Sequence, residues 1–184
     1  NTTFVLPGST GAEKVFLAGS FNNWKGDGLP MKKTFQGWEL PLYIAEGTHT
    51  YKFVVDGRWV ADPNNPITVP DGISGTNAVF RNGKPYLFRL NGFTDAKEVV
   101  LLGSFNQWRD FEWRMKKTDK GWELPFTLGP GNHEYKFKVD GKLIRDPENP
   151  IASTSRGSSF LILHPNYTFR LQNFPEAKAV FLAG

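Results

Sequence analysis

The stretch Val15–Trp24, VFLAGSFNNW, returns 84 residues later as Val99–Trp108, VVLLGSFNQW. The same spacing relates GWELP at Gly37–Pro41 to GWELP at Gly121–Pro125. Three further pairs keep this order: MKK at Met31–Lys33 and Met115–Lys117, YKFxVDG at Tyr51–Gly57 and Tyr135–Gly141, DPxNPI at Asp62–Ile67 and Asp146–Ile151. So much collinear identity indicates an internal duplication.

The repeated unit is about 80 residues long, which is enough for the core of one small β-sandwich and too long for a solenoid repeat. FRL at Phe169–Leu171 repeats FRL at Phe88–Leu90, and VFLAG at Val180–Gly184 repeats VFLAG at Val15–Gly19. We therefore predict three segments: copy one at 1–84, copy two at 85–165, and the opening strands of a third, incomplete copy at 166–184.

The side chains alternate between two faces in the repeated segments, as in half-buried strands. In the run that starts at His49, Tyr51 and Phe53 share one face while Lys52 lies on the other. Asp56-Gly57 then forms a dipeptide that favours a two-residue hairpin turn. Aromatic residues make up 15% of the chain, and 19 Gly and 13 Pro punctuate it, with no convincing long helix. The sequence predicts an all-β protein of two antiparallel β-sandwiches in tandem.

The repeated motifs G-S-F-N-x-W and H-x-Y-K-F-x-V-D-G resemble the glycogen-binding domain of the AMP-activated protein kinase β subunit, a member of carbohydrate-binding module family 48. The resemblance covers nearly all of both copies. It implies an immunoglobulin-like, early-set sandwich in each copy. It also implies non-catalytic binding of α-1,4-glucan, as a polysaccharide or a maltooligosaccharide, within a longer protein.

The resemblance assigns the glucan site in copy one to Trp24, Lys52, Trp59 and Asn77, with Ile73 near the leucine that wedges into a helical glucan in that family. The chemistry agrees, because a glucose ring needs an aromatic platform for its C–H face and polar groups for its hydroxyl rim. Three of these residues also have a structural interpretation: Trp24 as core, Lys52 as a solvated strand residue, Asn77 as a turn or strand-end residue.

Copy two departs from this pattern. Trp108 and Lys136 are kept as weaker candidates, but Leu143 stands at the position of Trp59 and Ser158 at about that of Asn77. Trp113 is new in the loop after Trp108, and Trp38 and Trp122 sit in alternating runs that favour the core. We expect copy one to bind glucan and copy two to bind it weakly or not at all.

Other functions find less support. Asp56, Asp140, Asp62 and Asp146 stand beside Gly or Pro, where turn chemistry explains them better than glycoside hydrolysis. His49 and His133 are copies of one strand position, so they do not form a metal cluster within one domain. The absence of Cys excludes disulfides and thiol nucleophiles. We expect no cofactor, metal or catalytic residue.

The net charge of +4 is spread along the chain, and no apolar run approaches membrane-spanning length, so neither nucleic acid nor membrane is an expected partner. The alternative to a glucan-binding tandem is a protein-interaction or spacer module that kept the sandwich and lost most sugar binding. The apolar residues of 166–184 add one expectation: if this segment is ordered, it pairs with another molecule by strand exchange.

Overall fold

The computed structural model of the chain describes residues 2–153, 157–164 and 170–180. The alternating run of copy one forms strand β6 (Gly47–Val55), whose Tyr51 and Phe53 side chains are buried in the core. Lys52 points to the opposite face, as predicted. Asp56 and Gly57 both have positive φ, 47° and 81°, and join β6 to β7 (Arg58–Val60).

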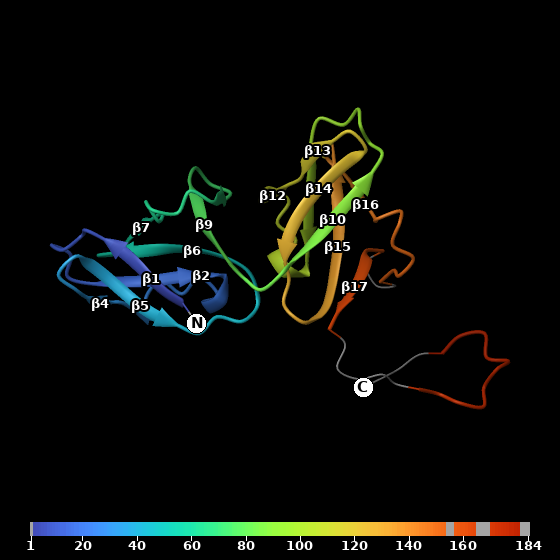
Figure 1. Cartoon of the computed structure of the whole chain (residues 1–184), viewed down its shortest axis with the longest axis horizontal. Coiled ribbons are helices and arrows are strands. Elements are labelled where there is room, and N and C mark those ends of the chain that lie inside the picture. Colours follow the sequence, from blue (N-terminus) through green and yellow to red (C-terminus); the bar gives the residue numbers. More distant parts are fainter. Residues whose placement is uncertain (1, 154–156, 165–169, 181–184) are drawn as a thin grey trace.

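Copy one is a sandwich of two antiparallel sheets (Figure 1). The smaller sheet has the order β1 (Thr2–Pro7), β5 (Gly37–Leu42), β4 (Lys32–Lys33). The larger has the order β3 (Leu29–Pro30), β2 (Val15–Gly19), β6, β9 (Thr76–Asn82), β8 (Thr68–Pro70), with β7 also paired to β6.

Copy two repeats this arrangement. Its smaller sheet is β10 (Pro85–Asn91), β14 (Gly121–Thr127), β13 (Lys116–Thr118). Its larger sheet is β12 (Trp113–Arg114), β11 (Val99–Gly103), β15 (Gly131–Val139), β16 (Lys142–Ile144), with β17 (Ser159–Leu163) also paired to β15. An isolated bridge between Ala152 and Ser159 replaces the counterpart of β8.

Helical structure in the described residues is confined to two three-residue 3-10 turns, η1 (Ser20–Asn22) and η2 (Ser104–Asn106). Within that part of the chain, no helix has the length and hydropathy needed to cross a membrane. The expectation of an all-β tandem is confirmed.

Each copy has its own aromatic core. Trp38 and Trp122 are buried, and their indole N–H groups donate to the carbonyls of Ser9 and Phe93, each at 3.0 Å. Trp113 is also core: its ring meets Phe126 edge-on at 4.8 Å. It therefore fills copy two and does not replace the lost aromatic platform.

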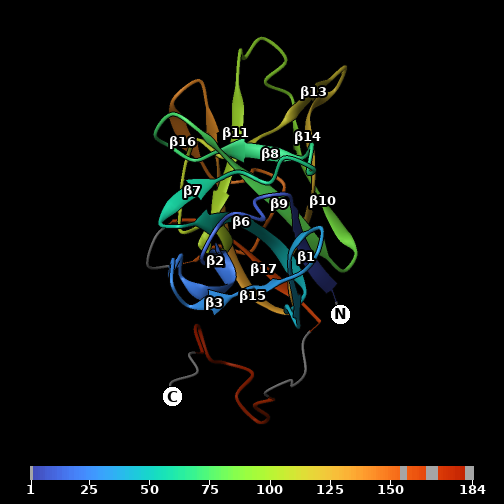
Figure 2. The same ribbon diagram turned by 90° about the vertical axis from the view of Figure 1, so that its left-hand side faces the viewer.

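The two sandwiches pack against each other (Figures 1 and 2). Val69 and Val79, on the outer face of the larger sheet of copy one, belong to the same buried apolar cluster as the core of copy two. Beside them, Thr48 Oγ1 donates to the Thr127 carbonyl at 2.9 Å and accepts from the Thr127 N–H at 3.1 Å. The outer face of β6 and β9 therefore meets copy two at one end and remains accessible at the other.

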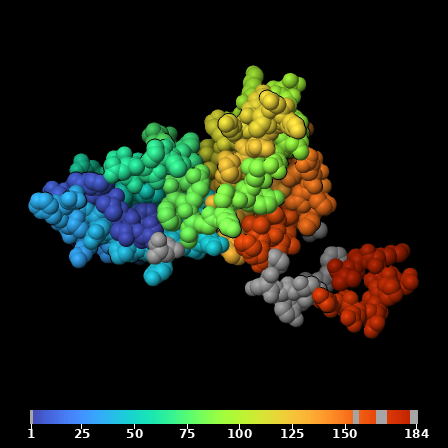
Figure 3. Space-filling view, in the orientation of Figure 1, coloured from blue at the N-terminus to red at the C-terminus, as the bar shows by residue number. Residues whose placement is uncertain are grey.

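The described part of the C-terminal segment, 170–180, contains turns and no strand. Its Leu171, Phe174 and Val180 side chains are exposed, and the segment projects from the two sandwiches in Figure 3. Phe169, Phe181 and Leu182 lie outside the described residues. The prediction of a third copy's opening strands therefore stays a prediction.

Candidate functional site

The repeated G-S-F-N-x-W motif forms a tight loop at the end of β2. A Cβ on Gly19 would lie 2.5 Å from the Thr50 carbonyl oxygen, so this position requires glycine. Asn22 then closes the loop: its Oδ1 accepts from the Gly19 N–H at 2.9 Å and its Nδ2 donates to the Lys25 carbonyl at 3.1 Å. The motif therefore sets the backbone that carries Trp24.

Trp24 itself has a left-handed backbone, with φ of 59°, which is uncommon for a bulky residue. Its N–H donates to the Gly19 carbonyl at 2.9 Å. The ring lies beside that of Trp59, with centroids 6.2 Å apart and planes inclined by 47°. Trp59 stands on β7, directly after the hairpin turn, and is 49% exposed. The two indoles form a bent aromatic platform on the surface of copy one.

Polar groups lie next to this platform. Lys52 Nζ donates to Asp71 Oδ2 at 2.7 Å, and both side chains are 14% exposed. The hydrogen bond from Lys52, followed by those from the N–H groups of Ile73 and Gly75, holds the pKa of Asp71 well below its usual range. Asp71 is therefore ionised at neutral pH, and its negative charge offsets the positive charge of Lys52.

Asn77 lies on β9 and is only 4% exposed. Among the described residues, its side-chain amide takes part in no hydrogen bond, so the amide is available to a ligand. Ile73, at the tip of the loop between β8 and β9, is 93% exposed.

All five predicted residues line one open groove of about 510 Å³: Trp24, Lys52, Trp59, Ile73 and Asn77. Three further residues that sequence reasoning missed complete the lining: Asp71, Ser74 and Arg109. Asp71 and Ser74 belong to the loop where the two copies diverge, so the repeat carried no information about them. Arg109 comes from copy two, and no local pattern could have placed it here.

The equivalent surface of copy two is altered. Leu143 pairs with Lys138 on β15, and Trp59 pairs with Val54 on β6. Because Lys138 and Val54 are equivalent positions of the two copies, Leu143 occupies the Trp59 position. Ser159 pairs with Tyr135, as Ala78 pairs with Tyr51 in copy one. Ser158, the residue before Ser159, therefore occupies the position of Asn77, the residue before Ala78.

The polar groups of copy two are also used differently. Ser158 is fully buried, and its hydroxyl donates to Glu134 Oε2 at 2.6 Å. Asp110, at the position of Gly26, accepts from Lys138 Nζ at 2.6 Å. Trp108 keeps the left-handed backbone of Trp24, with φ of 61°. Trp108 and Lys136 therefore keep their positions on a surface that has lost its second indole and its free amide.

The repeated aspartates serve the turns. Asp56 Oδ1 accepts from the N–H groups of Glu13 and Lys14, at 3.0 and 2.9 Å. Asp62 Oδ1 accepts from the Asn64 N–H at 2.9 Å, within its own turn. Asp140 and Asp146 repeat these bonds in copy two. Within residues 2–153, 157–164 and 170–180, no three potential metal-ligating side chains form a cluster.

The family model that describes the glycogen recognition site of AMP-activated protein kinase matches the chain twice, over residues 2–80 and 85–165. The chain belongs to this family. Both copies are accordingly non-catalytic modules of the glycogen-recognition type, as the sequence motifs predicted.

Curated relatives agree with this assignment. The chain is 44% identical to the 5′-AMP-activated protein kinase subunit beta-2 of Homo sapiens over an aligned segment of 63 residues. This segment covers 34% of this chain and 23% of that protein. The chain is also 44% identical to subunit beta-1 of Sus scrofa over an aligned segment of 57 residues, and that segment covers 31% of this chain and 45% of that protein. The chain thus spans less than half the length of these relatives.

Two solved structures are more distant. A maltogenic amylase from S. marinus is 14% identical, with a TM-score of 0.38, over 88% of this chain and 28% of its own. A pullulanase from Bacillus acidopullulyticus is 15% identical, with a TM-score of 0.35, over 86% of this chain and 31% of its own. Scores this low carry no argument about the present chain.

Proposed function

We propose that this protein binds α-1,4-glucan in the groove of copy one, with Trp24 and Trp59 stacking on successive glucose rings. The observation that carries this proposal is the 47° inclination between the two indole planes. Adjacent rings of an α-1,4-glucan turn relative to one another, so a bent platform suits them. A flat β-1,4-linked ribbon would need two platforms in one plane.

The polar lining supports a neutral ligand. Lys52 is compensated by Asp71 at 2.7 Å, and Arg109 by Glu112 at 3.0 Å. A groove whose charges are paired has little net attraction for anions or cations. The N–H groups of Lys52 and Arg109 that these ion pairs do not use, together with the Asn77 amide, suit the hydroxyl rim of a sugar.

Trp59→Ala tests the site directly. Loss of a desolvated aromatic platform costs about 2 kcal/mol, which is more than tenfold in affinity. We expect titration calorimetry with maltoheptaose to show this loss. Leu143→Ala, at the same ladder position of copy two, is the matched control and should bind as the unmutated protein does. Cellohexaose should bind poorly to all three proteins. Equal affinity of Trp59→Ala and the unmutated chain would exclude this groove as the site.

The asymmetry of the copies leads to a second proposal: copy one carries the glucan site and copy two contributes mainly structure. Leu143 and the engaged Ser158 support it. The same calorimetry should give one bound maltoheptaose per chain. Two sites of similar affinity would overturn it. A chain that binds no glucan at all would favour the alternative, a protein-interaction or spacer module.

The chain's wider role is also a proposal. The relatives are named as subunits of a kinase and are longer than the matched region. We infer that this tandem acts within a longer protein and brings it to glucan.

Strand exchange through 166–184 remains part of the proposal. Exposed Leu171, Phe174 and Val180 support it, because such side chains gain from burial against a second molecule. Light scattering on the full chain should show concentration-dependent dimers that are absent from 1–165. Monomers in both, with the segment shown to be structured, would contradict the exchange.

A further inference from the structure

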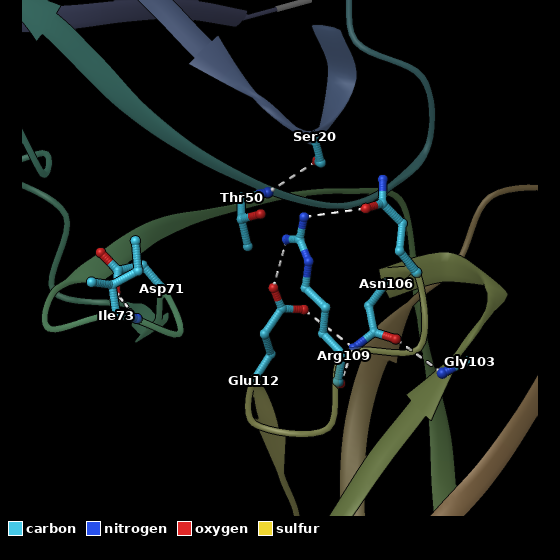
Figure 4. Close-up of polar contacts among 9 residues, drawn as sticks. Ser20, Thr50, Asp71, Ile73, Gly103, Asn106, Arg109 and Glu112 are labelled. Carbon is cyan, nitrogen blue, oxygen red and sulfur yellow. Dashed lines mark hydrogen bonds and ion pairs between the residues drawn. The ribbon is translucent and has the colours of Figure 1, made fainter. Parts of the chain in front are cut away.

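One of the eight residues that line the groove of copy one belongs to copy two. This residue is Arg109, whose side chain is 30% exposed. Figure 4 shows its guanidinium beside Thr50 on the outer face of β6, with Glu112 on the side that faces the loop of Asp71 and Ile73. Its accessible surface is therefore shared between the groove and the contact of the two sandwiches.

Arg109 is held in place by copy two. Its Nη1 donates to Glu112 Oε1 at 3.0 Å and its Nη2 to Gln107 Oε1 at 3.2 Å. Glu112 is only 3% exposed and also accepts from Asn106 Nδ2 at 3.2 Å. The Arg109 carbonyl accepts from the same Asn106 nitrogen at 2.8 Å. The guanidinium is therefore positioned before any ligand arrives.

This arrangement leaves donors for a ligand. A guanidinium carries five N–H groups. Among the described residues, two hydrogen bonds use it, to Glu112 and Gln107. The remaining donors are on a side chain that lines the groove, where hydroxyl oxygens of a sugar are suitable acceptors.

The loop that carries Arg109 differs between the copies. Lys25, Asp27 and Gly28 of copy one correspond to Arg109, Phe111 and Glu112 of copy two. Copy one thus lacks the Arg–Glu pair, although Asn22 and Asn106 close both loops in the same way. The divergent residues are those of copy two that approach copy one.

Phe111 provides the clearest contact. A Cβ on Gly72 would lie 2.5 Å from Phe111 Cζ, so the ring lies directly against the Gly72 backbone. Gly72, with φ of 84°, immediately precedes Ile73 at the tip of the groove loop. Copy two therefore supports the wall of the groove as well as contributing to its lining.

We propose that the glucan site is shared between the copies, with the Arg109 guanidinium donating hydrogen bonds to hydroxyls of the glucan that lies on Trp24 and Trp59. This inference rests on the proposed function of the groove. It makes copy two a part of the site, although copy two has lost the residues for a site of its own. The apolar contact through Val69 and Val79 keeps Arg109 at the groove.

Arg109→Ala and Lys25→Ala form a matched pair, because the two residues hold the same place in the two loops. In the full chain, we expect Arg109→Ala to weaken maltoheptaose binding about fivefold or more, and Lys25→Ala, which is exposed and does not line the groove, to leave it unchanged. Equal affinities for Arg109→Ala and the unmutated chain, with binding lost in Trp59→Ala, would overturn the shared site and leave the proposed function intact. No binding of maltoheptaose by the unmutated chain would overturn both.

Arg109→Ala also leaves the buried Glu112 without its cation, so a measurement on the unmutated protein is needed. Phenylglyoxal modifies accessible arginines, and peptide mass spectrometry reports each one separately. We expect maltoheptaose to slow the modification of Arg109 severalfold, while Arg89, which pairs with Glu123 away from the groove, reacts at an unchanged rate. Equal rates at Arg109 with and without maltoheptaose would contradict the proposal, since a merely structural arginine would not be shielded.

Discussion

At the scale of single residues, each core contains a tyrosine that holds a turn. Tyr135 donates from its hydroxyl to Asp146 Oδ2 at 2.6 Å and accepts from Asn149 Nδ2 at 3.0 Å. Tyr51 makes the same pair of bonds, to Asp62 at 2.6 Å and from Asn65 at 3.2 Å. Burial, reinforced by the neighbouring aspartate, raises the pKa of both phenols above the ordinary value. Each hydroxyl therefore stays protonated and donates.

Tyr135→Phe and Tyr51→Phe compare this bond in two environments. Asp146 is buried whereas Asp62 is half-buried. When the tyrosine donor is lost, Asp146 is therefore less able than Asp62 to accept a hydrogen bond from water instead. Hydrogen bonds to charged groups contribute about 1.5–3 kcal/mol. We expect Tyr135→Phe to lower the free energy of unfolding by an amount near the top of that range, and Tyr51→Phe by less, in urea titrations. The reverse order would show that exposure of the carboxylate does not set the cost.

A second prediction concerns Asn22, whose side chain closes the loop before Trp24. Asn22→Ala removes the acceptor for the Gly19 N–H and the donor to the Lys25 carbonyl. The left-handed conformation of Trp24 then loses its support, and the loss of these bonds should cost about 1–3 kcal/mol of stability. We expect weaker maltoheptaose binding together with a lower melting temperature. An unchanged affinity would mean that the loop holds Trp24 without Asn22.

At the scale of elements, the loop between β8 and β9 is organised by one carboxylate. Asp71 Oδ1 accepts from the Ile73 N–H at 2.9 Å and the Gly75 N–H at 3.0 Å, while Oδ2 accepts from Lys52. The loop is thus tied to β6 across the larger sheet. These bonds place Ile73 at the edge of the groove.

The charge on Asp71 predicts the pH dependence of binding. Because Lys52 and the two N–H groups lower its pKa, the carboxylate stays ionised from about pH 8 down to about pH 5. No histidine of the described chain lines the groove, and guanidinium groups in proteins do not lose their proton in this interval. We expect a constant dissociation constant for maltoheptaose across that interval in calorimetry. A loss of affinity on acidification within it would indicate a titrating group outside this set.

Asp71→Asn provides the corresponding variant. It keeps the size of the side chain but removes the charge that pairs with Lys52. We expect lower affinity for maltoheptaose at every pH in the same interval, because the loop and Lys52 both lose their fixed positions. Affinity equal to that of the unmutated chain would show that the pair does not shape the site.

At the scale of the whole molecule, the two sandwiches are coupled by buried contacts. Val69 and Val79 of copy one pack with the core of copy two, and Thr48 and Thr127 exchange two hydrogen bonds beside them. Separated copies would expose this apolar surface. The chain should therefore unfold as one unit, and variants of the full chain report on the site better than fragments do.

Val79→Ala tests this coupling. The substitution removes two buried methyl groups, each of which contributes about 0.8 kcal/mol to the free energy of unfolding. Calorimetric unfolding should show a single transition that moves to lower temperature, since both copies lose the contact. Val5→Ala, at an exposed position of β1, should change the free energy of unfolding by less than about 0.5 kcal/mol. Two separate transitions, of which only one moves, would contradict the coupling.

Much of this protein could be inferred from its sequence. Alternation placed Tyr51 and Phe53 inside and Lys52 outside, because strand geometry sends neighbouring side chains to opposite faces. The hairpin after Asp56 followed from its turn residues. Repetition and family motifs together predicted five residues that the structure brings to one groove: Trp24, Lys52, Trp59, Ile73 and Asn77. These features depend on local geometry or on patterns that occur twice.

Other features depended on the tertiary structure. The sequence showed Trp113 only as a new residue in the loop after Trp108, and packing against Phe126 makes it core. Asp71 lies in a loop and acquires its role from Lys52, which lies on β6. Arg109 reaches the groove of copy one only because the two sandwiches dock at one end of the same sheet face. Periodicity and repeats describe each copy by itself, whereas the docking arises from contacts between residues far apart in the chain, and it decides which side chains line the groove.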